Sequence, residues 1–404
     1  MKFLRRCFAA TILAMLDGRL LAAESSPEKI DLFHAGQGGF ALYRIPGIVV
    51  TAKGTVLTYC EARRTGGDWA DMNILLRRST DGGKTWDAAR NIAEVPGPKS
   101  KNPVRTNANP AEITYNNPVA ISDRDGSVHL LFCLEYMRCF HQRSEDDGRT
   151  WSAPVEITRA FEPLRSEYDW KVVALGPGHG IQLQNGRLLV PAWLSLGSGR
   201  NNHSPSLTAS LFSDDHGRTW KSAIAIPDSA QTPSPNETTA VQLADGHVLF
   251  NARSQTSESR RLVATSADGG VTWSAARPHP GLYEPVCMAS LVRYPEVSKG
   301  GTKALIFSQP APQDDADGKP ATGSSRERKN LTIRLSRDEG ETWAVHKTLE
   351  AGPSAYSDLA VLDDGTILCF YERGESNGKT PYAHLTVARF NLAWLAGEKP
   401  ASPK

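Results

Sequence analysis

Three arginines stand in short, distinctive contexts that lie far apart in the sequence. Arg44 lies within Tyr-Arg-Ile-Pro, Arg253 ends the apolar run 248–253, and Arg328 begins Arg-Lys-Asn-Leu-Thr. Guanidinium groups are planar and permanently charged, and their paired N–H donors match the geometry of a carboxylate. A single arginine at a strand end is usually solvated, so these three matter chemically only if the fold brings them together.

A repeated eight-residue phrase indicates the scaffold that must position these arginines. The phrase Ser-x-Asp-x-Gly-x-Thr-Trp occurs five times, at residues 79–86, 144–151, 213–220, 266–273 and 336–343. Asp81 and its equivalents can bond their own backbone in a turn, and Gly83 and its equivalents can adopt positive φ. We expect Thr85 and Trp86 to resume an extended strand. The recurrence predicts a repeat architecture, and we assign the phrase a structural rather than a catalytic role.

A second pattern alternates with the first. Lys-Gly, Asp-Gly or Asn-Gly pairs each precede an apolar strand-like run, namely 55–59, 128–133, 188–190, 248–251 and 367–371. Such pairs are strong hairpin signals, and no helical periodicity precedes the C-terminal tail. The prediction is an all-β, six-bladed β-propeller with Asp-box hairpin turns, and an open solenoid is the alternative. We expect residues 31–50 and 358–392 to complete one blade together and close the ring.

The composition of the chain predicts one large domain. The 404 residues carry a formal net charge of only +2, which gives no global attraction for nucleic acid or a membrane surface. Residues 1–23 resemble a secretory signal peptide, because basic residues precede an apolar run, and they predict export to the periplasm or the extracellular space. A disordered cytosolic leader is the alternative. The apolar run is too short to span a membrane. We assign residues 27–395 to the propeller and 396–404 to a loose tail.

The cysteines and histidines predict neither a disulfide framework nor a metal enzyme. Five cysteines follow the leader, most of them in apolar runs: Cys60, Cys133, Cys139, Cys287 and Cys369. Cys133 and Cys139 are the candidates for a disulfide pair, and the odd number of cysteines leaves at least one free thiol. Since no Cys/His cluster has zinc-ligand spacing, we predict no catalytic metal and no organic cofactor, and we leave Ca²⁺ binding by scattered loop aspartates open.

Several longer phrases resemble those of the Asp-box β-propeller sialidases, which are retaining glycoside hydrolases. They are YRIP at 43–46, EARR and GDWAD within 61–71, GPGHGIQL at 176–183, NETTAVQLADGHVLFNAR at 236–253, RKNLTIR at 328–334, and SAYSDL and FYE within 354–372. They follow the family order across nearly the whole chain after the leader. The resemblance implies an exo-α-sialidase that releases terminal α-linked sialic acids from glycoconjugates.

The resemblance implies a role for each of the three arginines. Sialic acid carries a carboxylate on its anomeric carbon, and family members bind that carboxylate with an arginine triad, here Arg44, Arg253 and Arg328. Converging cations repel one another, so a neighbouring carboxylate is expected. Glu372 matches the family residue that steadies the first arginine.

The resemblance also implies a tyrosine nucleophile, Tyr356, with Glu237 as its partner base. Sialidases are the exception among retaining glycosidases, most of which use a carboxylate nucleophile. A neutral phenol avoids repulsion by the carboxylate of the substrate, and a base can draw off its proton during attack. We expect the nearby arginines to lower the phenol pKa from its usual value of about 10. The structural alternative for Tyr356 is an ordinary core tyrosine.

A separate residue must protonate the leaving group and later activate water. The resemblance implies Asp68, which lies on a Gly-rich loop, and Asp71 is the competing candidate. Arg63 matches an additional arginine near this acid, with Arg64 as its alternative.

Other residues receive broader expectations. His179 either shapes the site or serves a Gly-rich turn. Residues 283–287 and 136–137 are expected to line the pocket for the N-acyl and glycerol arms, and Glu284 competes with Glu237 as a site carboxylate.

Three alternative functions remain open. The first is a non-catalytic sialic-acid-binding propeller, although a lectin has no need of a nucleophile and base such as Tyr356 and Glu237. The second is a propeller used only for protein interaction. The third is a neighbouring activity, either trans-sialylation or hydrolysis of a deaminated sialic acid, since fold and motif alone do not fix specificity.

Overall fold

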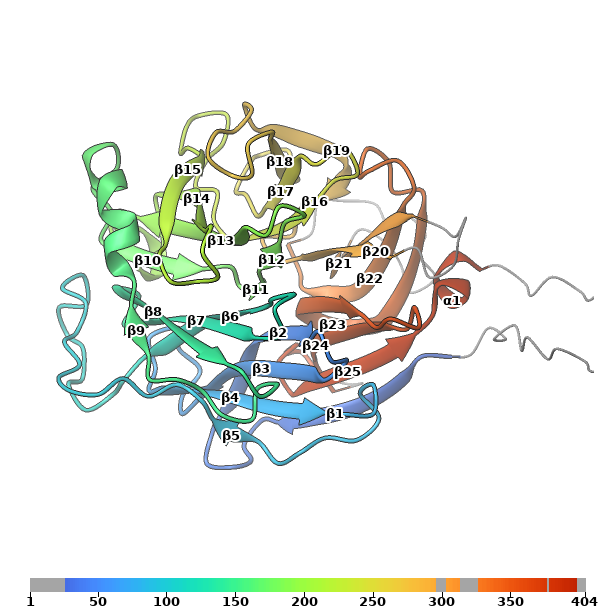
Figure 1. Ribbon diagram of the computed structural model, residues 1–404, viewed down its shortest axis with the longest axis horizontal. Helices are drawn as coiled ribbons and strands as arrows, with labels where there is room; N and C mark the ends of the chain where they lie inside the picture. The colour runs from blue at the N-terminus through green and yellow to red at the C-terminus, as the bar shows by residue number, and fades with distance from the viewer. Residues whose placement is uncertain (1–25, 296–302, 313–325, 376–377, 398–404) are drawn as a thin grey trace, which may run out of the picture.

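The chain forms a propeller-like assembly of β-sheets, which confirms the all-β prediction (Figure 1). The computed structural model describes residues 26–295, 303–312, 326–375 and 378–397. The predicted signal peptide and residues 398–404 of the predicted tail lie outside these ranges. Within them, no helix is long and apolar enough to cross a membrane.

Four sheets hold most strands of the first two thirds of the chain. The first contains β2 (Leu42–Val50), β3 (Val56–Arg63), β4 (Met72–Ser79) and β5 (Arg90–Asn91). The second contains β6 (Tyr115–Ser122), β7 (Val128–Leu134), β8 (Arg138–Ser144) and β9 (Val155–Glu156), with β11 (Gly178–His179) parallel to β6. The third contains β10 (Val172–Leu175), β12 (Ile181–Gln182), β13 (Leu188–Ser195), β14 (Ser206–Ser213) and β15 (Lys221–Ile226). The fourth contains β16 (Thr238–Gln242), β17 (Val248–Ala252), β18 (Arg260–Ser266) and β19 (Arg277–Tyr283).

A seven-stranded sheet joins the two ends of the described chain. Its order is β1 (Glu28–His34), β25 (His384–Phe390), β24 (Ile367–Arg373), β23 (Val345–Val361), β22 (Lys329–Ser336), β21 (Ala304–Pro310) and β20 (Ser290–Tyr294). Two short 3₁₀ helices, Thr158–Ser166 and Arg200–Asn202, and the helix α1 (Leu392–Ala396) complete the secondary structure of the described residues.

Ring closure differs from the prediction in one respect. β1 pairs antiparallel with β25, so the first and last strands close the ring as expected. The expectation that all of residues 31–50 join this blade was wrong, because β2 pairs with β3 in the first four-stranded sheet. The glycine-rich turn between β1 and β2, with Gly36, Gly38 and Gly39 at positive φ, redirects the chain from one sheet to the next.

The apolar core lies between neighbouring sheets. Val119 and Leu131 of the second sheet pack with Val173 and Val190 of the third, for example. The apolar runs that follow the Gly turns supply much of this core, and all five form strands as predicted: β3, β7, β13, β17 and β24. Burial of these side chains on both faces of each sheet explains why the runs are apolar at successive positions.

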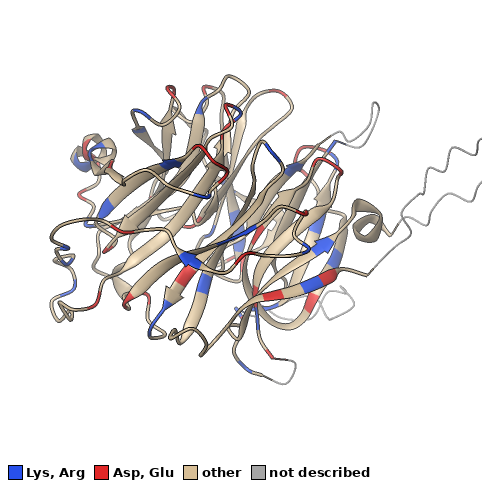
Figure 2. Ribbon diagram, turned by 60° about the horizontal axis from the view of Figure 1, so that its bottom comes forward, with Lys and Arg blue, Asp and Glu red and all other residues tan. Residues whose placement is uncertain are grey.

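Charged residues are distributed over strands and loops throughout the ring. Figure 2 shows Lys and Arg interspersed with Asp and Glu, which agrees with the small formal net charge of +2. The charges that bear on chemistry are therefore those placed locally.

The five repeated phrases form nearly identical turns. In the first, the amide of Gly83 donates to Ser79 Oγ at 2.8 Å, and Gly83 has a φ of 84°. Asp81 accepts from the amide of Thr85 at 2.9 Å and from its hydroxyl at 2.6 Å. The predicted Asp-centred turn with a positive-φ glycine is confirmed.

The expectation that the strand resumes at Thr85 and Trp86 was wrong. The next strand, β5, begins only at Arg90, and none of the five equivalent tryptophans lies in a strand. The physical reason is that Asp81 holds Thr85 in the turn, while the Trp86 indole N–H donates to the carbonyl of Gly83 at 3.2 Å. The ring of Trp86 folds back against the core between two sheets instead of extending the hairpin.

All cysteines in the described residues are free thiols. Cys133 and Cys139 face each other across β7 and β8, with their Sγ atoms 3.4 Å apart, so the candidate pair is in contact without a covalent bond.

We predict that Asp146→Ala weakens the second Asp-box turn by about 1 kcal/mol, because the amide and hydroxyl of Thr150 lose their acceptor. Hydrogen bonds from Thr150 lower the pKa of Asp146 to about 2. In the unfolded chain the pKa of this carboxyl is about 4. The stabilisation is therefore fully present above about pH 4 and is lost as the pH falls toward the lower pKa of the folded state.

Urea unfolding at about pH 6 and about pH 3 measures this effect. The gap in unfolding free energy between wild type and Asp146→Ala should shrink at the lower pH. Glu145→Ala removes an exposed neighbouring carboxylate and is the control. Equal effects of the two substitutions at both pH values would contradict the prediction.

Candidate active site

A cavity of about 610 Å³ brings together residues from separate sheets. Seven of the eight residues singled out from the sequence line it: Arg44, Arg63, Asp68, Glu237, Arg253, Arg328 and Tyr356. The eighth, Glu372, lies directly behind Arg44 and is completely buried. The arginines, which are separated by up to 284 positions (328 minus 44), therefore converge on one space.

Strand irregularities turn several of these side chains toward the cavity. The pairing of β2 with β3 slips between Arg44 and Gly47, where Ile45 has a φ of 59°. The pairing of β23 with β24 slips between Ser354 and Ser357, on either side of Tyr356. Such bulges re-aim side chains at the rims of sheets and are common beside functional sites.

Glu372 fixes the first arginine and the strand that carries the tyrosine. Its Oε1 accepts from Arg44 Nε at 2.6 Å and from the amide of Ile45 at 3.1 Å. Its Oε2 accepts from the amide of Tyr356 at 3.0 Å. A single buried carboxylate, fully hydrogen-bonded, thus holds the Arg44 guanidinium and the Tyr356 backbone in fixed relation.

Tyr356, Glu237 and Arg253 form a closed hydrogen-bonded set. The Tyr356 hydroxyl donates to Glu237 Oε1, and Arg253 Nη1 donates to Glu237 Oε2 at 2.5 Å and to the Tyr356 hydroxyl oxygen at 2.9 Å. Glu237 immediately precedes β16 and Arg253 immediately follows β17, so the antiparallel pairing of those strands places them together. The geometry suits proton transfer from the phenol to the carboxylate.

The expectation of a lowered phenol pKa is wrong for the free protein. Burial raises the pKa of Tyr356 well above its usual value, and the charge of Glu237 raises it further. Arg253 and Arg328 act in the opposite direction without overcoming these effects. Burial also tends to raise the pKa of Glu237, but Arg253 and the Tyr356 hydroxyl bring it below its usual value. Tyr356 therefore rests as a neutral phenol that donates to an ionised carboxylate.

Arg328 is held by neutral partners. Its Nη1 donates to the Tyr382 hydroxyl at 3.0 Å and its Nη2 to the carbonyl of Val286 at 2.8 Å. Its guanidinium carbon lies 5.1 Å from the centre of the Tyr356 ring. Because neither of these bonds involves a carboxylate, the positive charge of Arg328 remains available to an anion in the cavity.

Asp68 is paired with Arg63 at the edge of the cavity. Arg63 Nη1 donates to Asp68 Oδ1 at 2.8 Å, while Nε and Nη2 of Arg63 donate to Glu61 Oε2 at 2.9 and 2.6 Å. Burial alone would raise the pKa of Asp68, but the charge of Arg63 lowers it to about 2. Asn201 Nδ2 approaches the other oxygen of Asp68 at 3.3 Å. Asp68 is thus a carboxylate in the free protein.

Asp71 and Arg64, the alternatives to Asp68 and Arg63, lie outside the cavity lining. Asp71 accepts from the amide of Ile113 at 3.0 Å and from Arg64 Nε at 2.8 Å. Their ion pair braces the base of the loop that carries Asp68.

Glu284 and His179 are also removed from the cavity. Glu284 forms a fully buried ion pair with Arg261 at 2.6 Å. His179 Nδ1 lies 2.8 Å from Asp358 Oδ1. Burial would lower the pKa of His179, but the charge of Asp358 raises this pKa above its usual value. Asp358 also accepts from the amide of Ile48 at 2.9 Å, so His179 belongs to a support that ties β11, β2 and β23 together.

Aromatic side chains form one wall of the cavity, partly as expected. Tyr136 lines it, and so do Pro285 and Val286 of the expected segment 283–287, whereas Met137 does not. Sequence reasoning missed Trp193 and His203, which pack around Tyr136 with ring centres 6.3 and 4.8 Å away. Burial lowers the pKa of His203 to about 4, so this ring is neutral at pH 7.

Sequence reasoning also missed Tyr382. It stacks under Arg44, whose guanidinium carbon lies 4.1 Å from the ring centre, and its hydroxyl accepts from Arg328. Tyr382 thereby contacts two of the three arginines. No repeat or quoted phrase includes this residue, so no sequence signal marked it.

Two family profiles match the chain. The BNR repeat-like domain matches residues 108–369, and the BNR/Asp-box repeat matches residues 77–88. The longer match covers more than half of the chain.

Curated relatives and solved structures agree with these profiles. The chain is 32% identical to a sialidase of Micromonospora viridifaciens over 91% of this chain and 54% of the relative. It is 30% identical to a sialidase of Bacteroides fragilis over 89% of this chain and 64% of the relative. The chain thus spans between about half and two thirds of the length of these two relatives. An exo-alpha-sialidase of Aspergillus fumigatus is 26% identical, with 88% of this chain and 86% of the relative covered.

Among solved structures, the Hadza microbial sialidase aligns with a TM-score of 0.71 at 27% identity, covering 91% of this chain and 69% of that chain. The intramolecular trans-sialidase of Ruminococcus gnavus has the same fold, with a TM-score of 0.70 at 20% identity, covering 94% of this chain and all of that chain. The profile match, the curated relatives and the shared fold lead to one conclusion: the chain belongs to the BNR/Asp-box repeat family of sialidases.

Proposed function

We propose that the protein is an exo-α-sialidase that hydrolyses terminal α-linked sialic acids of glycoconjugates with net retention. The observation that carries this proposal is the set formed by Tyr356, Glu237 and Arg253 beside Arg44 and Arg328. Three guanidinium groups in one cavity suit a substrate carboxylate, and a phenol bonded to an ionised carboxylate suits nucleophilic attack next to that negative charge.

The resting protonation states support a concerted role for Glu237. The phenol of Tyr356 is a poor nucleophile while its proton is retained, and burial favours retention. A bound sugar carboxylate engages Arg253, which weakens the hold of that arginine on Glu237. Glu237 then becomes more basic and takes the phenol proton as the tyrosyl–sugar bond forms and the bond to the leaving oxygen breaks.

Asp68 serves in this proposal as the acid and then as the base. In the free protein it is ionised, because Arg63 lowers its pKa. A substrate carboxylate nearby adds negative charge to the cavity and raises the affinity of Asp68 for a proton. The protonated form can donate to the leaving oxygen, and the resulting carboxylate can activate the water that releases the sugar from Tyr356.

Two further expectations belong to this proposal. β23 pairs with β22 through residues 345–353 and with β24 through residues 354–361, which supports counting the seven-stranded sheet as two blades and the ring as six. The basic and apolar pattern of residues 1–23 supports export of a single propeller domain at 27–395.

We predict that Tyr356→Phe lowers kcat/KM on a fluorogenic α-sialoside by roughly 10³-fold or more, because the nucleophilic oxygen is removed. Tyr168→Phe, which removes a hydroxyl bonded to the carbonyl of Pro205 outside the cavity, should leave activity near wild type. Proton NMR of the first-formed sugar should show the retained α anomer.

Full activity of Tyr356→Phe would refute the assignment of the nucleophile. An inactive wild type that still binds sialosides would favour the lectin alternative over the enzyme.

We predict that Asp68→Ala discriminates between leaving groups. A sialyl-lactose substrate needs protonation of its leaving oxygen, so kcat/KM should fall by roughly 10²–10⁴-fold. An aryl sialoside with an acidic phenol leaving group should be affected much less in the glycosylation step. Initial rates on both substrates measure the ratio.

Asp71→Asn is the matched control, since it keeps an acceptor for the Ile113 amide and lies outside the cavity. If Asp71→Asn instead showed the selective loss on sialyl-lactose, the acid would be Asp71.

A further inference from the structure

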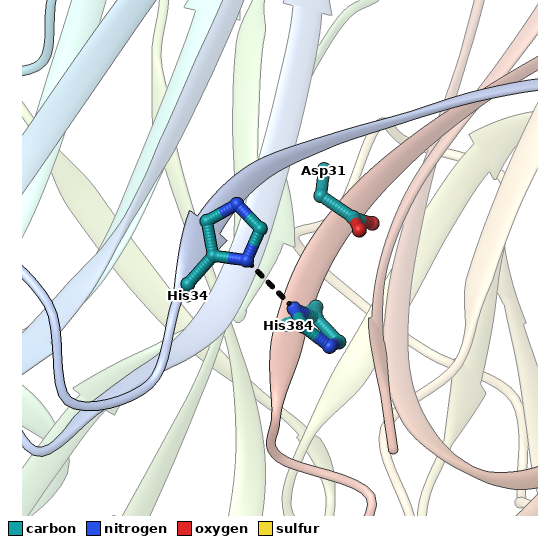
Figure 3. A group of neighbouring side chains, drawn as sticks. All are labelled: Asp31, His34 and His384. Atoms are coloured by element: carbon teal, nitrogen blue, oxygen red, sulfur yellow. Dashed lines mark hydrogen bonds between the residues drawn. The ribbon is translucent and has the colours of Figure 1, made fainter. Parts of the chain in front are cut away.

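Two histidines and an aspartate meet where the first strand pairs with the last (Figure 3). His34 of β1 and His384 of β25 are direct cross-strand partners, and their Nδ1 atoms lie 2.9 Å apart. The two rings are almost perpendicular, at 88°. Asp31 lies on β1 beside them, and one ligand atom from each of the three residues lies within 4.8 Å of the other two.

A bulge places Asp31 on the same side of β1 as His34. In a regular strand, residues three apart point to opposite faces. The pairing of β1 with β25 slips between Asp31 and Phe33, however, so one extra residue separates the two side chains and both turn toward His384. The bulge thus assembles three donor groups across the closing strands.

We propose that Asp31, His34 and His384 bind a divalent transition metal ion of the class that prefers imidazole ligands, with Zn²⁺ as the probe. Neutral imidazole nitrogen and carboxylate oxygen are common Zn²⁺ ligands, and water can complete a four-coordinate site. The ion would link β1 to β25 and strengthen ring closure.

Glu375 prepares His384 for this role. Its Oε1 lies 2.8 Å from His384 Nε2, so the proton of a neutral ring is held on Nε2 and the lone pair of Nδ1 faces His34. A carboxylate behind a ligating histidine is the usual outer arrangement of metal sites, where it fixes the tautomer and raises ligand basicity. Metal binding needs a shift of the His34 proton from Nδ1 to Nε2 and a small rotation of the two rings, so that both Nδ1 lone pairs face one ion.

Asp31 retains a free coordination position. Its Oδ1 accepts from Thr386 Oγ1 at 2.6 Å and from Arg373 Nε at 3.2 Å, and its Oδ2 accepts from Arg373 Nη2 at 2.6 Å. A carboxylate has about four acceptor sites, and one on Oδ2 therefore remains.

The nitrogen spacing is close to that of a metal site. Zn–N bonds of about 2.0–2.1 Å in a tetrahedron place two nitrogens roughly 3.3 Å apart. The two Nδ1 atoms, now 2.9 Å apart, need to separate by a few tenths of an ångström. Both imidazoles are partly exposed, which leaves a path for the ion.

A second cluster, formed by Asp123, Asp125 and His216, fits a metal less well. Asp123 already accepts from His216, Gln182 and the amide of Asp125, and His129 lies 3.3 Å away. Asp125 is engaged by Ser127 and by Arg143. Because four groups already surround the oxygens of Asp123, that carboxylate has no position left for an ion, and the cluster serves as a hydrogen-bonded clasp between the second and third sheets.

The proposed metal site is structural and independent of the proposed activity, because none of its residues lines the cavity. Its test is therefore binding and stability. Full-length protein is stripped with EDTA and titrated with Zn²⁺ by calorimetry, and its thermal unfolding is followed with and without Zn²⁺. We expect one Zn²⁺ per chain and a rise in Tm of about 2–4 °C or more at a large excess over Kd.

Variants assign the ligands. The double variant His34→Gln/His384→Gln should lose the binding heat and the Tm rise. Glu375→Gln changes an exposed side chain and leaves the three ligands in place, so it should weaken Zn²⁺ binding by about 10-fold. His216→Gln and His247→Gln remove histidines elsewhere and should bind as wild type does. Circular dichroism of each metal-free variant checks folding.

Absence of stoichiometric Zn²⁺ binding by the wild type overturns the proposal. So does unchanged binding by a folded double variant, and so does loss of binding in His216→Gln alone, which would move the site to the second cluster.

Discussion

The carboxylate of Glu372 is the interaction on which the arrangement of the cavity depends. It is completely buried, and it accepts hydrogen bonds from the Arg44 side chain and from the amides of Ile45 and Tyr356. An isolated buried carboxylate would be strongly unfavourable, so the strands that supply its donors must come together for the fold to be stable. The same requirement that stabilises the junction of β2, β23 and β24 also orients the proposed nucleophile and the first arginine.

The other charged groups of the cavity follow the same rule. Arg63 is held by Glu61 and Asp68, and Arg253 is held by Glu237. Each of these groups of charges lies on strand ends or adjoining loops of one sheet, whereas the three arginines of the triad come from three different sheets. Carboxylates beside the guanidiniums limit their mutual repulsion and leave Arg328, with neutral partners at both terminal nitrogens, to attract an anion.

Sequence reasoning identified the residues whose neighbours form distinctive phrases. The Asp-box turns, the strands after Gly turns and the convergence of Arg44, Arg253 and Arg328 are all found in the structure. It failed where the outcome depends on burial or long-range pairing. The pKa of Tyr356 is set by desolvation, Tyr382 has no marked context, and Trp86 folds back against the core with its indole N–H bonded to the carbonyl of Gly83. His34 and His384 are 350 positions apart, so no ligand spacing could reveal them.

The pairing of β1 with β25 has a consequence for how the polypeptide acquires its shape. His34 of β1 is synthesised 350 residues before His384, its partner in β25, and until then the pairing edge of β1 has no hydrogen-bonding neighbour. Unpaired strand edges promote aggregation, and contacts so distant along the chain slow folding. The propeller must therefore remain incompletely assembled until β25 has been synthesised, and β1 needs protection from other strands for as long as its partner is missing.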